Sequence, residues 1–250
     1  MIESHVILII SAVSFLASWF GTLVGGGGLI LVPVMLAFGV PAPIALGSRR
    51  FSAISTITTG MVAFHRAKKI DYRFSSSLLV YSLVGSVIGY LIVDSVSEAL
   101  LKKTIGVIIL ALALFLLLEN RGEVRAAKGK LFRYRHIIGP PVSALSGLLS
   151  VIIGGGGGLI LSYLIIIVYG QTILESSGNR RLTVLASNVL ATTLFIIGGY
   201  VNYPLAISML IANALGGWFG ARFYLRRGDE KVKVFFFSIV MLLGVKTLFF

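Results

Sequence analysis

Two stretches of sequence decide the fold: GGGGLILVPVMLAFGVPAPIALGSRRF at residues 25–51 and GGGGGLILSYLIIIVYGQTILESSGNRRL at residues 154–182. Each opens with a run of glycines and Leu-Ile-Leu, continues as an apolar segment, and ends on Gly-Xaa-Arg-Arg and an apolar residue. A membrane segment that is interrupted by glycines and leads to an arginine pair suits a binding site for a small anion. Its presence twice indicates two related halves.

The repeat extends beyond these two stretches. A shift of 130 residues places Gly25–Leu31 on Gly155–Leu161. A shift of 131 residues gives six further matches: Gly47 on Gly178, Arg49 on Arg180, Arg50 on Arg181, Tyr72 on Tyr203, Gly85 on Gly216 and Gly89 on Gly220. One inserted residue between the glycine run and the arginine pair accounts for the difference. Convergent glycine patterning of membrane helices is the alternative, but it does not readily give these matches in order at one offset.

The composition predicts a membrane protein. Of the 250 residues, 57% are hydrophobic and 12% are charged, whereas a soluble domain carries about 25% charged residues. Apolar runs such as 104–118, 184–201 and 234–250 approach the length that crosses hydrocarbon. The formal net charge of +13 therefore indicates basic cytoplasmic loops rather than binding to nucleic acid.

We expect an all-α integral membrane protein made of two inverted-topology repeats, with broken or re-entrant helices at the glycine runs. Each repeat has about five helical segments: 6–24, 28–46, 51–64, 74–93 and 104–118 in the first half, and 137–153, 158–175, 182–200, 204–224 and 234–250 in the second. The first repeat covers residues 1–118, a basic cytoplasmic linker 119–136, and the second repeat 137–250. The N-terminus lacks the basic region of a signal peptide, so the first segment is expected to stay in the membrane.

The inversion is predicted from the basic loops. Loops 65–73 and 119–136 are basic in the first half. In the second half the counterpart of the first loop, 201–203, is uncharged, and the basic loop is 222–233. Because Lys and Arg collect on the cytoplasmic side, this exchange predicts halves of opposite orientation. Both termini then lie on the outer side of the cytoplasmic membrane.

The glycines have two predicted roles. Glycine costs about 1 kcal/mol relative to alanine inside a helix, and a helix that restarts after a glycine run offers N–H groups to an anion. Candidate substrate-binding glycines are Gly26, Gly27, Gly156 and Gly157. A tight helix crossing is the alternative for them. The Gly-xxx-Gly pairs Gly85/Gly89 and Gly216/Gly220 are expected to pack helices closely and to have no ligand role.

The two arginine pairs are the predicted anion-binding groups. An arginine near the bilayer centre costs roughly 2.5–3.5 kcal/mol on insertion scales, and its planar fork of N–H donors fits oxyanions. Arg49, Arg50, Arg180 and Arg181 are expected to lie between apolar runs, with no carboxylate immediately beside them. The alternative is that each pair ends a helix at the headgroups. Only one arginine of each pair needs to face the cavity.

Three other polar residues join the candidate site. Ser48 and Asn179 occupy equivalent positions beside the arginine pairs and can add neutral hydrogen bonds. Glu175 is the carboxylate nearest to the second pair. It is either a proton carrier or a salt-bridge partner of Arg180 or Arg181.

Residues for metal binding or catalysis are not apparent in the sequence. The chain has no cysteine, and its three histidines share no metal-ligand spacing. It has no His-Glu-x-x-His, Gly-x-Ser-x-Gly or Walker pattern. We therefore expect no metal, no cofactor and no catalytic residue, which argues against a membrane-embedded enzyme.

Several motifs resemble those of a known family. The Gly-rich opening with LILVP ends at Pro33, Gly39-Val-Pro follows, and then Ala45-Leu-Gly-Ser; the loop HRAKKIDYR covers 65–73. In the second half, GNRRL at 178–182 and Asn188 match in part. Together these motifs resemble the TauE/SafE sulfite exporter family of membrane permeases over nearly the whole chain.

The resemblance implies passage of sulfur-containing oxyanions, such as sulfite or organosulfonates, across the cytoplasmic membrane, usually outward. The family usually has Thr at the positions of Ser48 and Asn179, and Asn at those of Arg49 and Arg180. This chain therefore has a more cationic candidate site. We expect a secondary transporter with a small anionic substrate, in contact with the lipid bilayer and not with nucleic acid; an anion channel, a permease for another small anion and a homodimer stay open.

Overall fold

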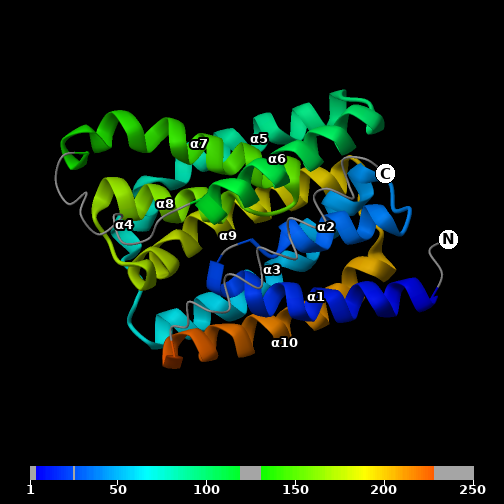
Figure 1. The fold of residues 1–250 in the computed structure, drawn as a ribbon, viewed down its shortest axis with the longest axis horizontal. Helices are drawn as coiled ribbons and strands as arrows, with labels where there is room; N and C mark the ends of the chain where they lie inside the picture. Colours follow the sequence, from blue (N-terminus) through cyan, green and yellow to red (C-terminus); the bar gives the residue numbers. More distant parts are fainter. Residues whose placement is uncertain (1–3, 25, 119–130, 228–250) are drawn as a thin grey trace.

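The computed structural model describes residues 4–24, 26–118 and 131–227, and every regular element within these ranges is helical (Figure 1). The bounds are α1 Ser4–Val24, α2 Gly28–Ala37, α3 Ala42–Arg66, α4 Tyr72–Ser77, α5 Leu79–Ser95, α6 Glu98–Leu118, the 3-10 helix η2 Phe132–Tyr134, α7 Arg135–Ile153, α8 Gly157–Tyr169, α9 Ile173–Ile197 and α10 Tyr203–Arg227. The all-helical class is thereby confirmed for the described residues. The expected segment 234–250 and residues 119–130 of the expected linker lie outside them.

Four of the described helices contain stretches that are long and apolar enough to cross a membrane: Ser4–Thr22, Phe132–Ile153, Leu174–Ile197 and Tyr203–Phe223. Helices α2, α5 and α8 are apolar but shorter. Large apolar side chains point outward along the bundle, with Leu8, Ile137 and Ile197 each more than 70% exposed. A surface of this kind fits the hydrocarbon of a bilayer better than water.

The arginine pairs lie within helices rather than between them, which corrects the expected segments 28–46 and 158–175. In the first half the helical chain ends at Ala37, and Pro41 caps a new helix, α3. In the second half Gly170 takes a left-handed conformation with φ of 68°, and Thr172 caps α9. Each arginine pair therefore lies about two turns into a helix of 25 residues.

The two arginine-bearing helices lie side by side in the middle of the bundle, where α3 packs against α9 (Figure 1). Helix α3 also packs against α10, and α10 packs against α1. On the other side, α9 contacts α5 and α8, and α5 packs against α7. The first helix of each half thus packs against a helix of the other half: α1 against α10, and α7 against α5.

The Gly-xxx-Gly pairs lie where α5 packs against α7 and where α10 packs against α1. A Cβ on Gly85 of α5 would overlap the carbonyl of Ala144 in α7. A Cβ on Gly216 of α10 would overlap the carbonyl of Phe15 in α1. One turn further along, the second glycine of each pair lies against the same neighbouring helix. Close helix packing, the role predicted for these glycines, is confirmed.

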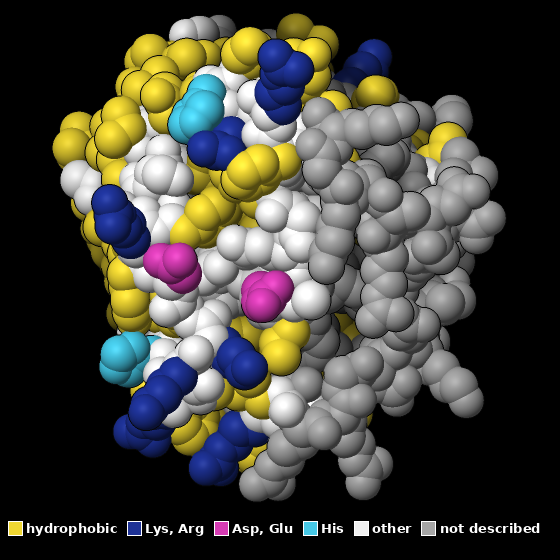
Figure 2. Space-filling model, turned by 90° about the vertical axis from the view of Figure 1, so that its left-hand side faces the viewer, with side chains coloured by type: hydrophobic (Ala, Val, Ile, Leu, Met, Phe, Trp, Pro, Cys, Tyr) yellow, Lys and Arg dark blue, Asp and Glu magenta, His cyan; other side chains and the backbone are white. Residues whose placement is uncertain are grey.

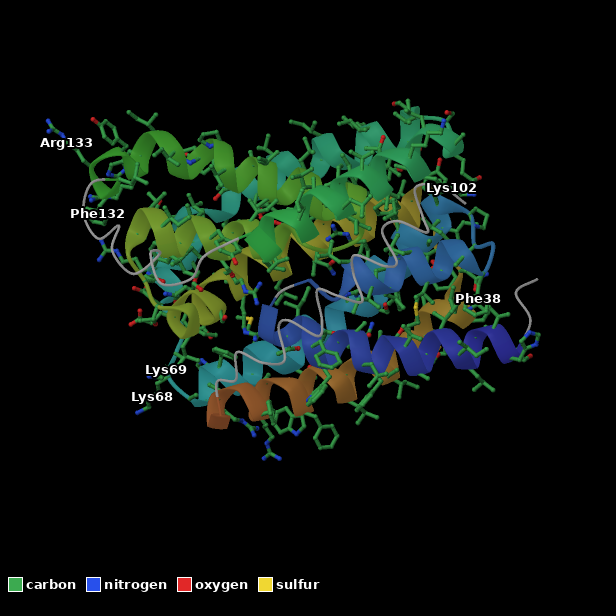
Figure 3. The ribbon with its side chains drawn as sticks, viewed as in Figure 1. Phe38, Lys68, Lys69, Lys102, Phe132 and Arg133 are labelled. Carbon is green, nitrogen blue, oxygen red and sulfur yellow. The ribbon has the colours of Figure 1, made fainter. Side chains whose placement is uncertain are left out.

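Charged side chains collect at the ends of the bundle. Lys68, Lys69 and Arg133 lie at one end, while Lys102 and Phe38 lie at the other (Figure 3). Figure 2 looks onto the first end, where Lys and Arg side chains outnumber Asp and Glu in the described part of the surface. Helix α1 begins at the opposite end of the bundle (Figure 1).

Candidate functional site

A cavity of about 80 Å³ lies between the two halves of the chain. Since one water needs about 10–15 Å³ of such space, the cavity has room for a few waters or a small oxyanion. The lining residues are Ser18, Gly21, Thr22, Gly27, Gly28, Arg49, Arg50, Ala53, Thr56, Ile57, Ser150, Gly154, Gly155, Gly156, Gly158, Arg180, Arg181, Val184 and Asn188. All four predicted arginines are among them, and each is no more than 6% exposed.

The glycine runs meet at this cavity. The backbone of Gly28 lies against the backbone of Gly154 and Gly155. A Cβ on Gly28 would overlap the backbone of the second glycine run, and a Cβ on Gly155 would overlap that of the first. Of the predicted substrate-binding glycines, Gly27 and Gly156 line the cavity, whereas Gly26 and Gly157 are not among the lining residues. Gly157 instead packs against α7.

Glycine is required here by backbone conformation as well as by space. Gly154 ends α7 with φ of 69°, and Gly156 precedes α8 with φ of 86°. Residues with a Cβ rarely adopt such values. The chain therefore leaves one helix at the glycine run and begins the next. Gly28 at the start of α2 and Gly156 and Gly158 around the start of α8 line the cavity, which places the positive ends of these helix dipoles beside it.

Arg50 of the first half is held in place by two helices of the second half. Its Nη1 donates to Asn188 Oδ1 of α9 at 3.0 Å, and its Nη2 donates to Ser150 Oγ of α7 at 2.9 Å. The amide nitrogen of Asn188 donates in turn to the Arg50 carbonyl at 3.0 Å. These contacts fix the guanidinium of Arg50, which extends from α3 to α7 and α9 of the second half.

Arg49 is buried without such partners. Its Nε and Nη1 are buried and make no hydrogen bond with the described residues. A Cβ on Gly27 would lie 3.4 Å from its Nη2, which places the guanidinium beside the first glycine run. A buried donor without a partner costs free energy, so the geometry of Arg49 favours an added acceptor.

Arg181 extends from α9 toward α3. Its guanidinium carbon lies 4.2 Å from the centroid of the Phe64 ring, a distance that gives a cation–π interaction. The same guanidinium contacts Gly60, where a side chain would overlap it. Arg50 and Arg181 thus cross between the two central helices in opposite senses.

Ser48 and Asn179 contact loops and are not among the lining residues. Ser48 Oγ accepts the backbone N–H of Asn202 at 3.0 Å, and Asn179 Oδ1 accepts the backbone N–H of Asp71 at 2.6 Å. Asp71 and Asn202 are themselves 131 residues apart. Each half therefore uses the residue before its first arginine to hold a loop of the other half.

The same two loop residues cap helices. Asp71 Oδ1 accepts the N–H of Phe74 at the start of α4, and Asn202 Oδ1 accepts the N–H of Leu205 in the first turn of α10. A capping side chain satisfies an N–H that the helix leaves unpaired. Asp71 and Asn202 thus each cap the helix that follows them with the side chain and contact the other half with the backbone N–H.

Glu175 is part of a capping box at the exposed start of α9. Its carboxylate accepts from the Thr172 backbone N–H at 2.8 Å and from Thr172 Oγ1 at 2.9 Å, while its own N–H donates to Thr172 Oγ1. Glu175 is not among the lining residues, and no Asp or Glu is among the described residues that line the cavity.

Comparison with known proteins adds the family. The sequence profile described as "Sulfite exporter TauE/SafE" matches residues 10–247. The chain belongs to the TauE/SafE family. A probable membrane transporter protein of Haemophilus influenzae is 25% identical, with 90% of this chain and 88% of that protein covered. The probable membrane transporter protein YfcA of Escherichia coli K12 is 23% identical, with 100% and 92% covered. No solved structure matches the chain.

These names describe transporters, not enzymes, and they confirm the resemblance seen in the sequence. This TauE/SafE family member is a multi-pass membrane transporter, in keeping with its apolar helices. Within the described residues there is no group of three or more His, Cys, Asp or Glu side chains that could hold a metal ion.

Sequence reasoning missed the hydroxyl groups of this TauE/SafE site. Ser18 and Thr22 of α1, Thr56 of α3 and Ser150 of α7 all line the cavity. A signal was present, because Ser14, Ser18 and Thr22 recur every four residues along a largely apolar helix and so share one face.

Proposed function

We propose that the chain is a secondary transporter that carries small sulfur-containing oxyanions, such as sulfite or organosulfonates, outward across the cytoplasmic membrane. The observation that carries the proposal is the meeting of four buried arginines, two from each half, at one cavity. Guanidinium groups fit oxyanions by charge and geometry. The description of the family as sulfite exporters favours sulfur among the oxyanions.

We further propose that residues 1–118 and 137–250 form two inverted repeats joined by the cytoplasmic linker 119–136. Paired contacts support this. The Ser48–Asn202 and Asn179–Asp71 hydrogen bonds lie at equivalent repeat positions, and so do the packing of Gly47 against Tyr200 and of Gly178 against Lys69. In Figure 1, α1 and α7 begin at opposite ends of the bundle. The glycine runs are then breaks within membrane segments, at the level of the site.

Transport in this proposal proceeds by alternating access. With no anion bound, the buried guanidiniums repel one another in a medium of low dielectric. An anion offsets this repulsion, so the loaded site can pass through a closed state more easily than the empty one. The two halves rock against each other at the contact between the glycine runs, and the cavity opens first to one side and then to the other.

Orientation follows from the charged ends. The end that carries Lys68, Lys69 and Arg133 is proposed to be cytoplasmic (Figures 2 and 3). The start of α1 then lies on the outer side, and so does the C-terminus by inversion. A membrane-impermeant reagent on intact cells should label a cysteine introduced at Ser4 and not one introduced at Lys69. The reverse pattern would contradict the orientation.

Flux in proteoliposomes tests the function. The purified chain should catalyse saturable uptake of radiolabelled sulfite, and Arg50→Ala and Arg181→Ala should each lower the rate at least tenfold. Lys103→Ala, which removes an exposed cation of α6, is the matched control and should transport normally. Unchanged uptake in both arginine variants would contradict the site. Flux that never saturates, together with single-channel currents, would indicate an anion channel.

A further inference from the structure

We propose that this cavity selects oxyanions with two negative charges over singly charged anions of the same shape. The inference rests on the proposed transport function and adds the charge state of the substrate to it. Sulfate, thiosulfate and fully deprotonated sulfite belong to the favoured class. Methanesulfonate and hydrogen sulfite belong to the disfavoured one.

The balance of charge in the cavity is the first argument. Arg49 and Arg50 are adjacent, buried and form no ion pair with any described residue. No carboxylate is among the described residues that line the space. Arginine keeps its proton at any physiological pH. An anion with one charge leaves the Arg49–Arg50 pair half compensated, and an anion with two charges matches it.

Burial makes this difference large. Water and salt screen the charge of an exposed ion, but the effective dielectric constant is lower around buried groups. Arg49 and Arg50 are 5% and 3% exposed. The second negative charge of a bound anion therefore interacts more strongly here than it would at the protein surface.

The hydrogen-bond donors give the second argument. Arg50 uses Nη1 and Nη2 on Asn188 and Ser150, which leaves its Nε without a partner among the described residues. Nε and Nη1 of Arg49 are also buried without a hydrogen-bond partner among the described residues. Three buried donors on two of the lining residues thus have no acceptor among the described residues. An anion whose oxygens all carry negative charge satisfies them better than one that replaces an oxygen with a methyl group.

The size of the cavity favours a small anion. Its volume is about 80 Å³, and Ala53, Ile57 and Val184 contribute apolar side chains to its lining. The favoured anion is therefore compact.

Sulfate and methanesulfonate form a matched pair of probes, because both are tetrahedral and differ mainly by one oxygen and one charge. In proteoliposomes that contain the full chain, each is added as a competitor of radiolabelled thiosulfate uptake. We expect sulfate to inhibit at a concentration at least tenfold lower than methanesulfonate. Sulfite gives an independent check: its apparent affinity should rise as pH rises from 6 to 8, while that of sulfate stays constant.

A variant tests the cause of the selectivity. Arg49→Gln keeps an N–H donor and removes one positive charge, so the preference for sulfate should shrink to about threefold or less. Lys103→Gln removes a positive charge from the exposed surface of α6 and should leave the preference intact. If Arg49→Gln does not give a monodisperse protein, Arg50→Gln, at the other arginine of the pair, replaces it.

Each outcome is decisive. Equal inhibition by the two probes in the unmodified chain overturns the charge selectivity and leaves the transport function standing. A preference that is identical in Arg49→Gln and in the unmodified chain overturns the role of the arginine pair. Absence of uptake of thiosulfate and sulfite alike overturns the proposed function, and the inference with it.

Discussion

The backbone of Gly28 lies directly against the backbone of Gly154, so the two glycine runs touch beside the arginine-lined cavity. No side chain fits between them. The contact joins the start of α2 to the end of α7, and therefore the first half of the chain to the second.

Gly28→Ala tests this contact. The added methyl group must push the two backbones apart, and overpacking of this kind costs about 1–3 kcal/mol. We expect a lower midpoint of thermal unfolding in detergent and a loss of transport. Gly39→Asn is the control, because Gly39 has open space around it and a φ of 76°, which asparagine tolerates. An unfolding midpoint for Gly28→Ala equal to that of the control would contradict the close contact.

Asn188→Ala tests the fixation of Arg50. The change removes the acceptor of Arg50 Nη1 and the donor to the Arg50 carbonyl. Hydrogen bonds to charged groups contribute about 1.5–3 kcal/mol, so we expect a weaker apparent affinity for the anion together with reduced stability. Thr193→Val, at an exposed hydroxyl of the same helix, should change neither quantity. Normal KM in Asn188→Ala would show that Arg50 does not depend on this partner.

Ser48→Ala and Asn179→Ala test the two loop contacts. Each leaves one backbone N–H, of Asn202 or Asp71, without its acceptor, which costs about 1–3 kcal/mol. Because the two contacts involve separate loops and share no partner, the losses should add within about 0.5 kcal/mol in the double variant. Strong non-additivity in urea or thermal unfolding would show that the two contacts are coupled.

Asp71→Ala and Asn202→Ala should be more damaging than the loss of an ordinary cap. Each change removes an N-cap, worth about 0.5–2 kcal/mol, and loosens the loop whose N–H contacts the other half. The measurement is protease sensitivity of the 66–71 and 198–202 loops. A variant as resistant as the unmodified chain would contradict the linked role.

Glu175→Gln separates two roles of that residue. The capping box needs a side-chain acceptor at this position, and glutamine provides one. We expect transport within about twofold of normal and an unchanged dependence of the rate on pH. Loss of the pH dependence would instead identify Glu175 as a proton carrier, the role that the sequence left open.

The sequence pointed to the four arginines that line the cavity because the arginine pairs are local and repeated. Glycine is a poor helix former, and arginines in a membrane segment are rarely incidental. The all-helical class and the glycine packing of α5 and α10 followed from the same kind of reasoning. The 131-residue offset already related Arg49 to Arg180.

Helix boundaries were predicted less well, although local signals existed. Pro41 and Pro43 favour a helix start at Ala42, and Thr172 with Glu175 is a capping box. Giving these signals less weight than hydropathy placed the arginines between helices. Stronger use of capping would have put them inside α3 and α9.

The partners of Ser48 and Asn179 could not be predicted in the same way. Their acceptor atoms bind backbone N–H groups that lie 154 and 108 residues away in sequence. Only the packing of one half against the other brings them together. The candidate role of these two residues in substrate binding stays a prediction, while their contacts are with loops.

Helix α1 packs against α10 and helix α7 against α5, so each half covers a helix of the other, which bears on the ancestry of the chain. A single copy of this unit would expose the glycine-lined faces that its counterpart now covers. Under the proposed inversion, an ancestral gene that encoded one copy would have needed two polypeptides inserted in opposite directions to bury those faces. Fusion of such genes would have fixed both orientations in one reading frame and allowed the copies to diverge, as the substitution of Ser48 by Asn179 across the repeat illustrates.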